Sequence, residues 1–314
     1  MKIKQKNKKI AVLGYGSQGR SFALNLKDSG YDITVGLKSN SRSRAKAKKD
    51  GLKNITTIGN ATQNCDILIF ALPDHLQGRI FASDIAPNLK SFKTLVFLHG
   101  FSIHFNTIIP PDNCDLLLLA PHAPGVAVRE KYQTERNISA FYAVEQNVSK
   151  KASQTVFELA ASVGFKKNKL IKTTFADETL GDLFGEQAVL CGGLTELIMA
   201  GYRTLVKNGL SEEKAYLEVA YQLDLIVALI KNHGIKGMFD RISVAARYGA
   251  VENGEKIIDA SVEKRMQKLF QQIKSGPFSK NLSNITDKEL DELDQKISRK
   301  TDPKFEKAAK KFAK

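Results

Sequence analysis

The chain has few cysteines and no long hydrophobic run, and both shortages narrow the class of protein. Its three cysteines, Cys65, Cys114 and Cys191, lie in or beside apolar segments without metal-ligand spacing, which is typical of small core residues in a reducing compartment. No uninterrupted apolar run approaches the length of a bilayer span. The first residues lack the apolar segment of a secretory signal. We therefore expect a cytoplasmic protein that does not act at a membrane.

The positive net charge of +15 suggests phosphate-bearing ligands, but it does not by itself predict nucleic-acid binding. The basic residues are spread along the chain as lysines and are concentrated at its ends, in residues 1–9 and 299–314. We expect solubility and small phosphorylated molecules to account for this charge, and we expect no nucleic-acid partner. The 314 residues, 42% of them hydrophobic, suit a soluble globular protein of two domains.

A strand, a glycine-rich turn and a helix follow one another near the N-terminus. Residues 9–13 predict a strand that runs into Gly14-Tyr15-Gly16-Ser17-Gln18-Gly19, and a helical pattern ends near residue 30. In this setting the first glycine permits a tight turn, the second lets the backbone approach a pyrophosphate, and the third lets helix and strand pack closely. The helix N-terminus offers N–H groups to the phosphates. Residues 14–19 are therefore predicted to bind a dinucleotide.

The end of the second predicted strand, residues 32–37, indicates which dinucleotide is bound. An NAD site usually places an acidic residue there to hold the ribose 2′-hydroxyl. Here residues 38–44 read Lys-Ser-Asn-Ser-Arg-Ser-Arg, with three cations, three hydroxyls and no acid. Cations and hydroxyls are the donors that a 2′-phosphate needs. The loop therefore favours NADP(H), the alternative being a merely solvated basic loop.

The strand–helix alternation continues to about residue 172. Strands are predicted at 65–71, 94–98, 115–120 and 139–145, and a helix at 153–163. Continuous apolar strands alternating with helices predict an α/β fold with a doubly wound parallel sheet, which binds ligands at the carboxyl ends of its strands. Pro73, His99 and His122 each follow a predicted strand and are expected at that edge.

From about Thr173 the strand signals vanish, and helices are predicted at about 182–207, 211–231 and 255–274. This shift predicts a Rossmann-type domain at 1–174 and an all-helical domain at 175–281. The polar, lysine-rich tail at 282–314 is expected to be either a charged surface helix or partly disordered.

Two of the predicted helices carry carboxylates on an otherwise apolar surface. Residues 181–193, GDLFGEQAVLCGG, read as the start of a buried helix with Asp182 and Glu186 on one face, because the two lie four residues apart. Two buried like charges need a cation between them, and oxygen ligands on a rigid face suit Mg²⁺. The alternative is a solvated first turn. Glu218 and Gln222 repeat this spacing on the second helix, which Gly234 is expected to end.

These segments together resemble the ketol-acid reductoisomerase family, short class, from about Lys8 to Phe278. The resemblance rests on the fingerprint at 14–19 and on the run at 182–197, with supporting stretches at His99-Gly100-Phe101, 215–218 and Ser243. It implies a Rossmann domain followed by a knotted all-helical domain that dimerises or forms a larger assembly of dimers. It also implies an NADPH- and Mg²⁺-dependent reaction of branched-chain amino-acid synthesis. In it an alkyl group of 2-acetolactate-type acids migrates, and the resulting 2-keto acid is reduced to a 2,3-dihydroxy acid.

The resemblance also implies roles for single residues. Asp182 and Glu186 would bind metal, and Glu218 and Gln222 occupy the positions of a second pair that comes from the partner subunit. Ser243 would hydrogen-bond the substrate carboxylate. His99 would lie by the nicotinamide and the substrate, and the cofactor contacts beside the fingerprint would be Lys38, Ser41, Ser43, Pro73 and Gly125. His122, which departs from the family pattern, could act as a catalytic acid or base near neutral pH.

Three positions depart from the family pattern. Gln222 replaces a glutamate, and His122 and Val126 replace a lysine and a histidine. An amide keeps an oxygen ligand but loses the charge, and imidazole is no equivalent of a lysine ammonium. The sequence therefore leaves three alternatives open: an active reductoisomerase with an altered site, a divergent NADPH-dependent 2-keto acid reductase without the migration step, or a non-catalytic nucleotide-binding protein.

Overall fold

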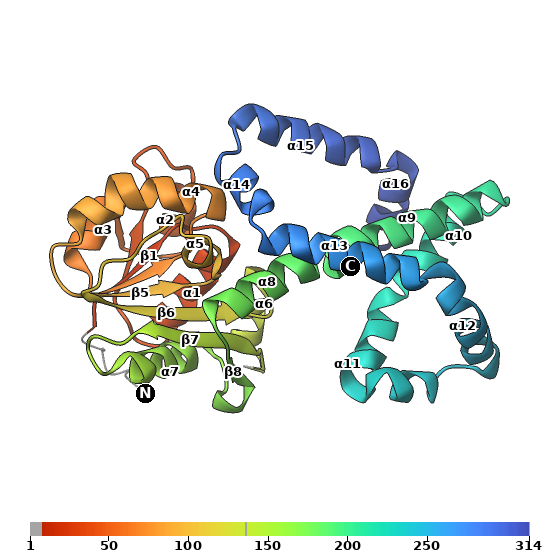
Figure 1. Cartoon of the computed structure of the whole chain (residues 1–314), viewed down its shortest axis with the longest axis horizontal. Coiled ribbons are helices and arrows are strands. Elements are labelled where there is room, and N and C mark those ends of the chain that lie inside the picture. Colours follow the sequence, from red (N-terminus) through yellow and green to blue (C-terminus); the bar gives the residue numbers. More distant parts are fainter. Residues whose placement is uncertain (1–7, 136, 314) are drawn as a thin grey trace. The chain divides into compact units, whose positions relative to one another are not determined.

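The computed structural model describes residues 8–135 and 137–313. The chain divides into two compact units (Figure 1). Unit 1 contains residues 1–181 and 276–284, and unit 2 contains residues 182–275 and 285–314. The division falls inside one helix, α8 (Phe175–Gly185).

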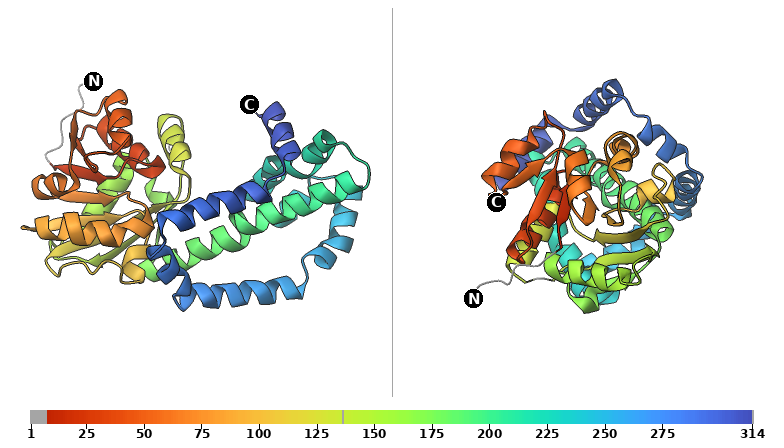
Figure 2. Two further views of the ribbon diagram at one scale, coloured as in Figure 1. Left: turned by 90° about the horizontal axis from the view of Figure 1, so that it is seen from above. Right: turned by 90° about the vertical axis from the view of Figure 1, so that its left-hand side faces the viewer.

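Unit 1 is built on an eight-stranded sheet with the order β3-β2-β1-β4-β5-β6-β7-β8 (Figures 1 and 2). The strand order reverses between β1 and β4, which are parallel neighbours, and such a reversal opens a ligand crevice at the carboxyl ends of the strands. The strands are β1 (Ile10–Leu13), β2 (Ile33–Gly36), β3 (Asn54–Thr56), β4 (Ile67–Phe70), β5 (Lys93–Phe97), β6 (Cys114–Pro121), β7 (Ala140–Gln146) and β8 (Leu170–Lys172).

The six longer strands lie where the sequence predicts them, and the doubly wound α/β fold is confirmed. The prediction of a purely parallel sheet is wrong at one place, because β7 pairs with β6 in the antiparallel direction. The sequence analysis also missed β3 and β8. Each contains only three residues and lies at a sheet edge, so neither carries the apolar run by which the central strands are recognised.

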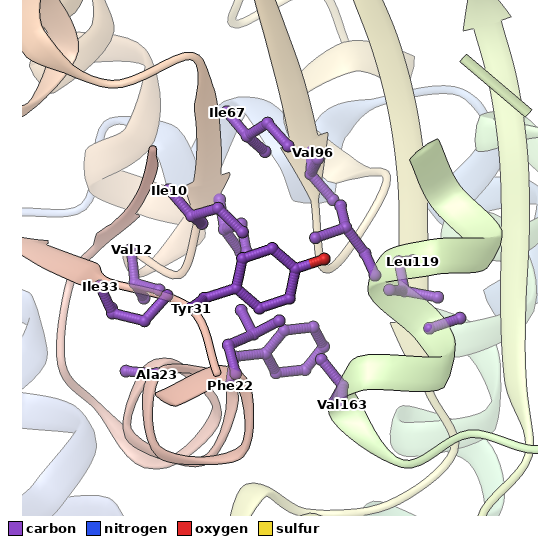
Figure 3. Packing of buried hydrophobic residues seen from close by; sticks show 14 of the residues in the cluster. Ile10, Val12, Phe22, Ala23, Tyr31, Ile33, Ile67, Val96, Leu119 and Val163 are labelled. Carbon is purple, nitrogen blue, oxygen red and sulfur yellow. The ribbon is translucent and has the colours of Figure 1, made fainter. Parts of the chain in front are cut away.

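Helices cover both faces of the sheet because successive strand residues point to opposite sides. Ile10 and Val12 join one buried cluster and Ala11 and Leu13 the other. Figure 3 shows the first cluster, with the Tyr31 ring among side chains of β1, α1 and α7. The helices are α1 (Ser17–Asp28), α2 (Ser43–Lys49), α3 (Ile58–Asn64), α4 (Asp74–Ile80), α5 (Phe101–His104), α6 (Gly125–Gln133), α7 (Ala152–Val163) and α14 (Pro277–Ser283).

The first residues of α1 and α6 meet at the carboxyl edge of the sheet. Gly125 packs so tightly that a Cβ atom there would lie 2.2 Å from the carbonyl carbon of Ser17 and 2.6 Å from the backbone nitrogen of Gln18. The Ser21 hydroxyl also donates to the carbonyl oxygen of Gly125. Only a residue without a side chain allows the two helix ends to approach this closely.

Within the described residues, unit 2 is entirely helical. Two of its helical runs are interrupted by π-helical segments, η4 (Glu186–Leu190) and η5 (Leu217–Tyr221). Its other elements, besides the end of α8, are α9 (Gly192–Lys207), α10 (Glu212–Tyr216), α11 (Leu223–Phe239), α12 (Val244–Ile257), α13 (Ala260–Lys274), α15 (Asp287–Lys300) and α16 (Pro303–Phe312).

Several predicted helix limits need correction. The first long helix begins at Phe175 rather than near Asp182, and the predicted helix at 255–274 is α13, which begins only at Ala260. Helix α12 was not predicted, because none of its described residues is buried and its sequence therefore lacks the pattern of a buried helix face. Gly234 has positive φ and interrupts α11, as predicted for a helix-ending glycine.

The tail forms helices, as the first of the two expectations for it stated. Helix α16 packs on α9 and α10 through the Phe305 ring, whose centroid lies 5.1 Å from that of Tyr202 and 5.2 Å from that of Tyr216. The tail lysines pair with acids of the same unit, for example Lys311 with Glu213 at 2.8 Å. Lysine charge is therefore partly neutralised inside unit 2.

The contact at Gly125 makes a prediction about folding stability. Gly125→Ala is expected to lower the free energy of unfolding by about 1–3 kcal/mol, because the added methyl group overlaps rigid backbone. Gly16→Ala is the matched control, since its Cβ would meet no atom within 4 Å. Urea unfolding followed by circular dichroism measures both. A Gly125→Ala protein as stable as the Gly16→Ala protein would contradict this description of the junction.

Candidate active site

The glycine-rich turn after β1 has the arrangement that the sequence predicts. Gly14 has φ +99°, and a Cβ there would lie 2.4 Å from the carbonyl oxygen of Ala71 at the end of β4. Gly19 is equally closed in, because its Cβ would lie 2.6 Å from the carbonyl oxygen of Gly14. The position of Gly16 is open. The protein thus fills the space at the first and third glycines and leaves the second accessible to a ligand.

Tyr15, within this turn, and Arg20, directly after it, both bind the carboxylate of Asp50. The buried Tyr15 hydroxyl donates to Asp50 at 3.0 Å, and Arg20 donates to both oxygens of the same carboxylate at 2.7 and 2.8 Å. Burial and the bond to Asp50 raise the pKa of Tyr15, while the Arg20 guanidinium lowers the pKa of Asp50. Tyr15 can therefore offer a cofactor its backbone, because its side chain is used in this network.

Two helix N-termini are available to an anion beside Gly16. Within the described chain, neither α1 nor α6 has a side-chain cap or an acid in its first turn. Gln18 links the two, since its Nε2 donates to the carbonyl oxygen of Ala123 at 2.8 Å. Its Oε1 is buried without a hydrogen-bond partner among the described residues. These donors and the open place at Gly16 fit a pyrophosphate.

The basic loop after β2 is only partly as predicted. Lys38 and Arg42 are exposed, and Ser41 and Ser43 lie together where the Ser43 N–H donates to the Ser41 hydroxyl at 3.3 Å. The third cation, Arg44, instead donates to the carbonyl oxygens of Thr56 and Ile55 at the end of β3. Two cations and the hydroxyls therefore remain to receive a 2′-phosphate.

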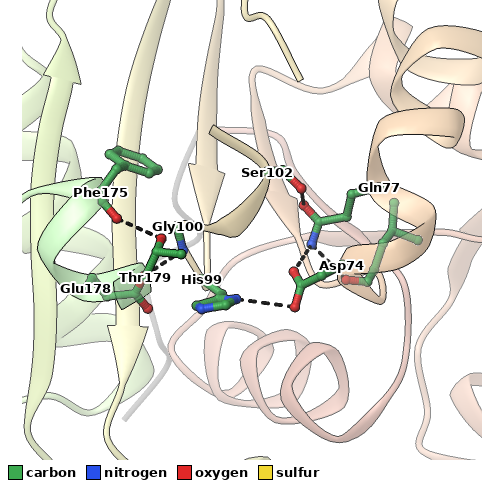
Figure 4. A network of polar contacts seen from close by, with 9 residues as sticks. Asp74, Gln77, His99, Gly100, Ser102, Phe175, Glu178 and Thr179 are labelled. Atoms are coloured by element: carbon green, nitrogen blue, oxygen red, sulfur yellow. Dashed lines mark hydrogen bonds and ion pairs between the residues drawn. The ribbon is translucent and has the colours of Figure 1, made fainter. Parts of the chain in front are cut away.

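His99 follows β5 and belongs to a chain of polar contacts at the same edge (Figure 4). Its Nδ1 lies 3.2 Å from Oδ2 of Asp74, the first residue of α4. The other oxygen of Asp74 accepts from Gln77 at 3.0 Å, and Gln77 in turn accepts from the Ser102 hydroxyl at 2.9 Å. Sequence reasoning assigned no role to Asp74 or Gln77, although both stand at the start of the helix that follows β4.

A buried carboxylate fixes the residue next to His99. Glu178 on α8 is 4% exposed, and its Oε2 accepts from the backbone N–H of Gly100 at 2.6 Å. A Cβ at Gly100 would lie 2.5 Å from the Thr179 hydroxyl and 2.7 Å from the carbonyl oxygen of Phe175. The contact ties the start of α8 to the loop that carries His99. Its only signal in the sequence is an acid near a helix start.

His122 follows β6 and is exposed at the same edge of the sheet. Its Nδ1 lies 3.0 Å from the Ser139 hydroxyl, and its ring meets the Phe141 ring edge-on with centroids 4.2 Å apart. Pro73 and Gly125 begin the turns into α4 and α6 and are also at this edge. The topology of unit 1 therefore gathers all its predicted site residues at the carboxyl ends of the strands.

The predicted metal ligands lie in or beside π-helical segments of unit 2. Asp182 lies near the end of α8 and Glu186 opens η4, while Glu218 lies in η5 and Gln222 follows it. Single π-helical turns inside α-helices often mark functional sites. Gln222 Nε2 lies 3.4 Å from Glu218 Oε2, so these two side chains share a face as predicted.

The prediction that this helical surface is buried is wrong for the single chain. Asp182 and Glu186 are exposed, and so are Leu190, Leu194 and Leu197. Within residues 8–135 and 137–313 no group of three or more His, Cys, Asp or Glu side chains could hold a metal ion. One chain therefore does not assemble both carboxylate pairs into one metal site.

Ser243 is the N-cap of α12, where its hydroxyl accepts from the Ala246 N–H at 3.1 Å. It is exposed, like most of α12. A capping serine at a helix start can also donate its hydroxyl proton to an anion. The substrate role predicted for it remains a prediction.

Comparisons with known proteins cover both units. Residues 4–168 match the model of the acetohydroxy acid isomeroreductase NADPH-binding domain, and residues 175–314 match that of the ketol-acid reductoisomerase C-terminal domain. A ketol-acid reductoisomerase (NADP(+)) of Xanthomonas oryzae pv. oryzae is 43% identical over 273 residues, which are 87% of this chain and 82% of that protein.

Among solved structures, an NADH-preferring ketol-acid reductoisomerase from an uncultured archaeon has a TM-score of 0.92 at 35% identity, covering 98% of this chain and 95% of its own. An oxidoreductase of Jannaschia sp. shares the fold alone, with a TM-score of 0.66 at 13% identity over 89% of this chain and all of its own. Two family models that together span nearly the whole sequence, and a relative 43% identical over most of it, place this chain in the ketol-acid reductoisomerase family.

Proposed function

We propose that the protein is an NADPH- and Mg²⁺-dependent ketol-acid reductoisomerase that acts in the cytoplasm in branched-chain amino-acid synthesis. Its substrate would be a 2-hydroxy-2-acyl acid such as 2-acetolactate, and its product a 2,3-dihydroxy acid. The observation that carries the proposal is the retention of Asp182 near the end of α8 and of Glu186 and Glu218 on π-helical segments, in a chain whose two halves match the family.

The cofactor residues of unit 1 support the first half of this proposal. The N-termini of α1 and α6 and the open place at Gly16 receive the pyrophosphate, and Lys38, Ser41 and Ser43 receive the 2′-phosphate. His99, held by Asp74, stands at the strand edge where it can exchange a proton with a substrate oxygen. When bound, NADPH supplies the hydride and Mg²⁺ supplies Lewis acidity.

The metal residues of unit 2 have the right donor chemistry. Asp182, Glu186 and Glu218 offer carboxylate oxygens and Gln222 an amide oxygen, and Mg²⁺ binds oxygen ligands almost exclusively. Gln222 presently directs its nitrogen toward Glu218, so its amide must turn over to offer oxygen to a cation. The set thus fits Mg²⁺, with one negative charge fewer than a site of four carboxylates.

A second copy of the chain is proposed to complete this site and to cover the apolar face of unit 2. Leu190, Leu225 and Tyr248 are 66, 61 and 69% exposed. The helical run of residues 175–207 is long and apolar enough to cross a membrane, by length and composition alone. The expectation that no segment of the chain has this property is therefore wrong. That run carries the acids of the proposed metal site, however, and a second copy bearing Glu218 and Gln222 both buries the apolar face and adds ligands. The assembly is therefore at least a homodimer.

Gln222 favours a second candidate function, a 2-keto acid reductase that has lost the migration step. Hydride transfer to a ketone needs one polarised carbonyl, whereas the migration also needs an alkoxide to be stabilised. A shell that has lost one carboxylate holds its cations less firmly. Both functions use the same cofactor residues, and only the substrate distinguishes them.

Oxidation of NADPH by the purified protein with Mg²⁺ tests the proposal. We expect turnover both with 2-acetolactate and with 3-hydroxy-3-methyl-2-oxobutanoate, and loss of both in Glu186→Gln. Turnover of the second substrate alone would replace the proposal by the reductase. No turnover of either would contradict both functions and leave a nucleotide-binding protein without this activity.

The three departures from the family pattern make a second prediction. The triple variant Gln222→Glu, His122→Lys, Val126→His is expected to raise turnover of 2-acetolactate by about tenfold or more and to tighten Mg²⁺ binding, because it restores the charge at the metal shell. Gln272→Glu, on an exposed face of α13, adds the same charge elsewhere and serves as the control for Gln222→Glu. A triple variant that gained neither property would show that these positions do not limit the enzyme.

The assembly makes a third prediction. Leu190→Glu combined with Leu225→Glu is expected to convert the dimer to monomers, because two charges would enter a buried apolar interface. Ile171→Glu, at an exposed apolar position of unit 1, is expected to leave the dimer intact. Sedimentation velocity measures all three proteins. A monomeric parent protein, or a dimer that survives the double substitution, would refute the interface.

A further inference from the structure

We propose that Asp74 is a positioning residue that holds the His99 imidazole in its Nδ1–H tautomer and in one ring orientation. The inference rests on the proposed function for its catalytic consequence, whereas the tautomer itself can be measured without turnover. The observation behind it is the contact of 3.2 Å between His99 Nδ1 and Asp74 Oδ2.

The direction of this hydrogen bond follows from the chemistry of the two groups. An ionised carboxylate only accepts hydrogen bonds, so the proton between the two residues must be carried by His99 Nδ1. In a neutral imidazole the other nitrogen, Nε2, then has the lone pair. His99 would therefore meet a substrate with Nε2 as its proton acceptor.

Asp74 is itself held in place by buried groups whose orientation is unambiguous. Gln77 is 3% exposed, and its Nε2 donates both to Asp74 Oδ1 at 3.0 Å and to the carbonyl oxygen of Leu72 at 2.8 Å. Its Oε1 accepts from Ser102, which is fully buried. Because a carbonyl oxygen can only accept, the Gln77 amide cannot be reversed. The buried Ser102 and Gln77 thus fix which atom donates and which accepts at Asp74.

Two further contacts restrain the histidine. The His99 ring stacks on the Phe101 ring with centroids 6.2 Å apart and planes 28° apart. The adjoining Gly100 N–H donates to the buried Glu178 carboxylate. Asp74 and Glu178 are charged groups of neighbouring elements that contact residues 99 and 100. The His99 ring is therefore restrained by Phe101, the adjoining backbone by Glu178, and Nδ1 by Asp74.

Loss of the carboxylate should change the tautomer more than the fold. In Asp74→Asn an amide N–H can donate to Nδ1 and would then favour the Nε2–H tautomer, which removes the acceptor from Nε2. A wrong tautomer lowers kcat without preventing substrate binding. We expect kcat to fall by about 10–100-fold, the usual cost of removing the partner that orients a site histidine, with KM changed by less than about threefold.

Nitrogen-15 NMR of the histidine side chains tests the tautomer directly. The chain has five histidines, and the His99→Gln spectrum identifies the signal of His99. At about pH 8, where imidazoles are mostly neutral, we expect His99 in the Nδ1–H form in the parent protein. We expect the Nε2–H form, or a mixture, in Asp74→Asn, and recovery of Nδ1–H with part of kcat in Asp74→Glu. Asp84→Asn, which removes a carboxylate that contacts Ser83 rather than His99, should change neither quantity.

Ser102→Ala gives a second test if Asp74→Asn unfolds. It removes the hydroxyl that orients Gln77 and leaves Asp74 and His99 unaltered, so we expect a smaller fall in kcat and a partial loss of the Nδ1–H form. The proposal is overturned if His99 is Nε2–H in the parent protein, or if the tautomer or the kcat of an active enzyme is unchanged in Asp74→Asn. A parent protein without turnover would refute the proposed function alone, because the NMR result stands without it.

Discussion

The close approach of α1 and α6 at the carboxyl edge of the sheet is the constraint on which unit 1 depends. Gly125 allows it by having no side chain, and Ser21 and Gln18 hold it by hydrogen bonds across the junction. The result is two uncapped helix N-termini beside the open place at Gly16. Backbone N–H groups at helix starts are ready-made donors for phosphate. The position of every other predicted cofactor residue follows from the sheet that orients these two helices.

Unit 2 presents the opposite situation, because its chemistry is incomplete in one chain. Its predicted metal-binding carboxylates lie on or beside π-helical segments and are exposed, as are leucines of the same helical run that a lone soluble chain would normally bury. The proposed second copy of the chain would both bury these leucines and complete the proposed metal site. The substitution of Gln for Glu at position 222 then bears on activity rather than on folding, since Gln222 is exposed in the single chain.

The elements best predicted from the sequence are those whose own residues carry a recognisable pattern. The fingerprint at 14–19, the apolar central strands and the change to helices after Thr173 each carry their own pattern, and all were found. The antiparallel direction of β7 was not predictable, because strand direction is set by the path of the connection rather than by the strand's composition. The short edge strands β3 and β8 were not predicted, because neither contains an apolar run.

Within the site, the hydrogen-bond partners of the side chains could not be predicted from the sequence. Arg44 was one of the three cations counted in the basic loop, but it donates to two carbonyl oxygens at the end of β3. Asp74 and Glu178 were passed over, although they hold His99 and Gly100 through contacts between residues 25 and 78 positions apart in sequence. The i, i+4 spacing placed Glu218 and Gln222 on one face correctly, whereas nothing in that spacing reveals the π-helical turn that carries Glu218.

Titration of the protein with NADPH and with NADH, followed by nicotinamide fluorescence, tests most directly the claim that this strand edge binds a 2′-phosphorylated dinucleotide. The account predicts that NADPH binds at least about tenfold more tightly, because charge-assisted donors at Lys38, Ser41 and Ser43 meet the extra phosphate. It also predicts that Gly16→Ala, which has room for its methyl group only while the site is empty, binds neither cofactor. Equal affinity for the two cofactors, or tighter binding of NADH, would contradict this claim.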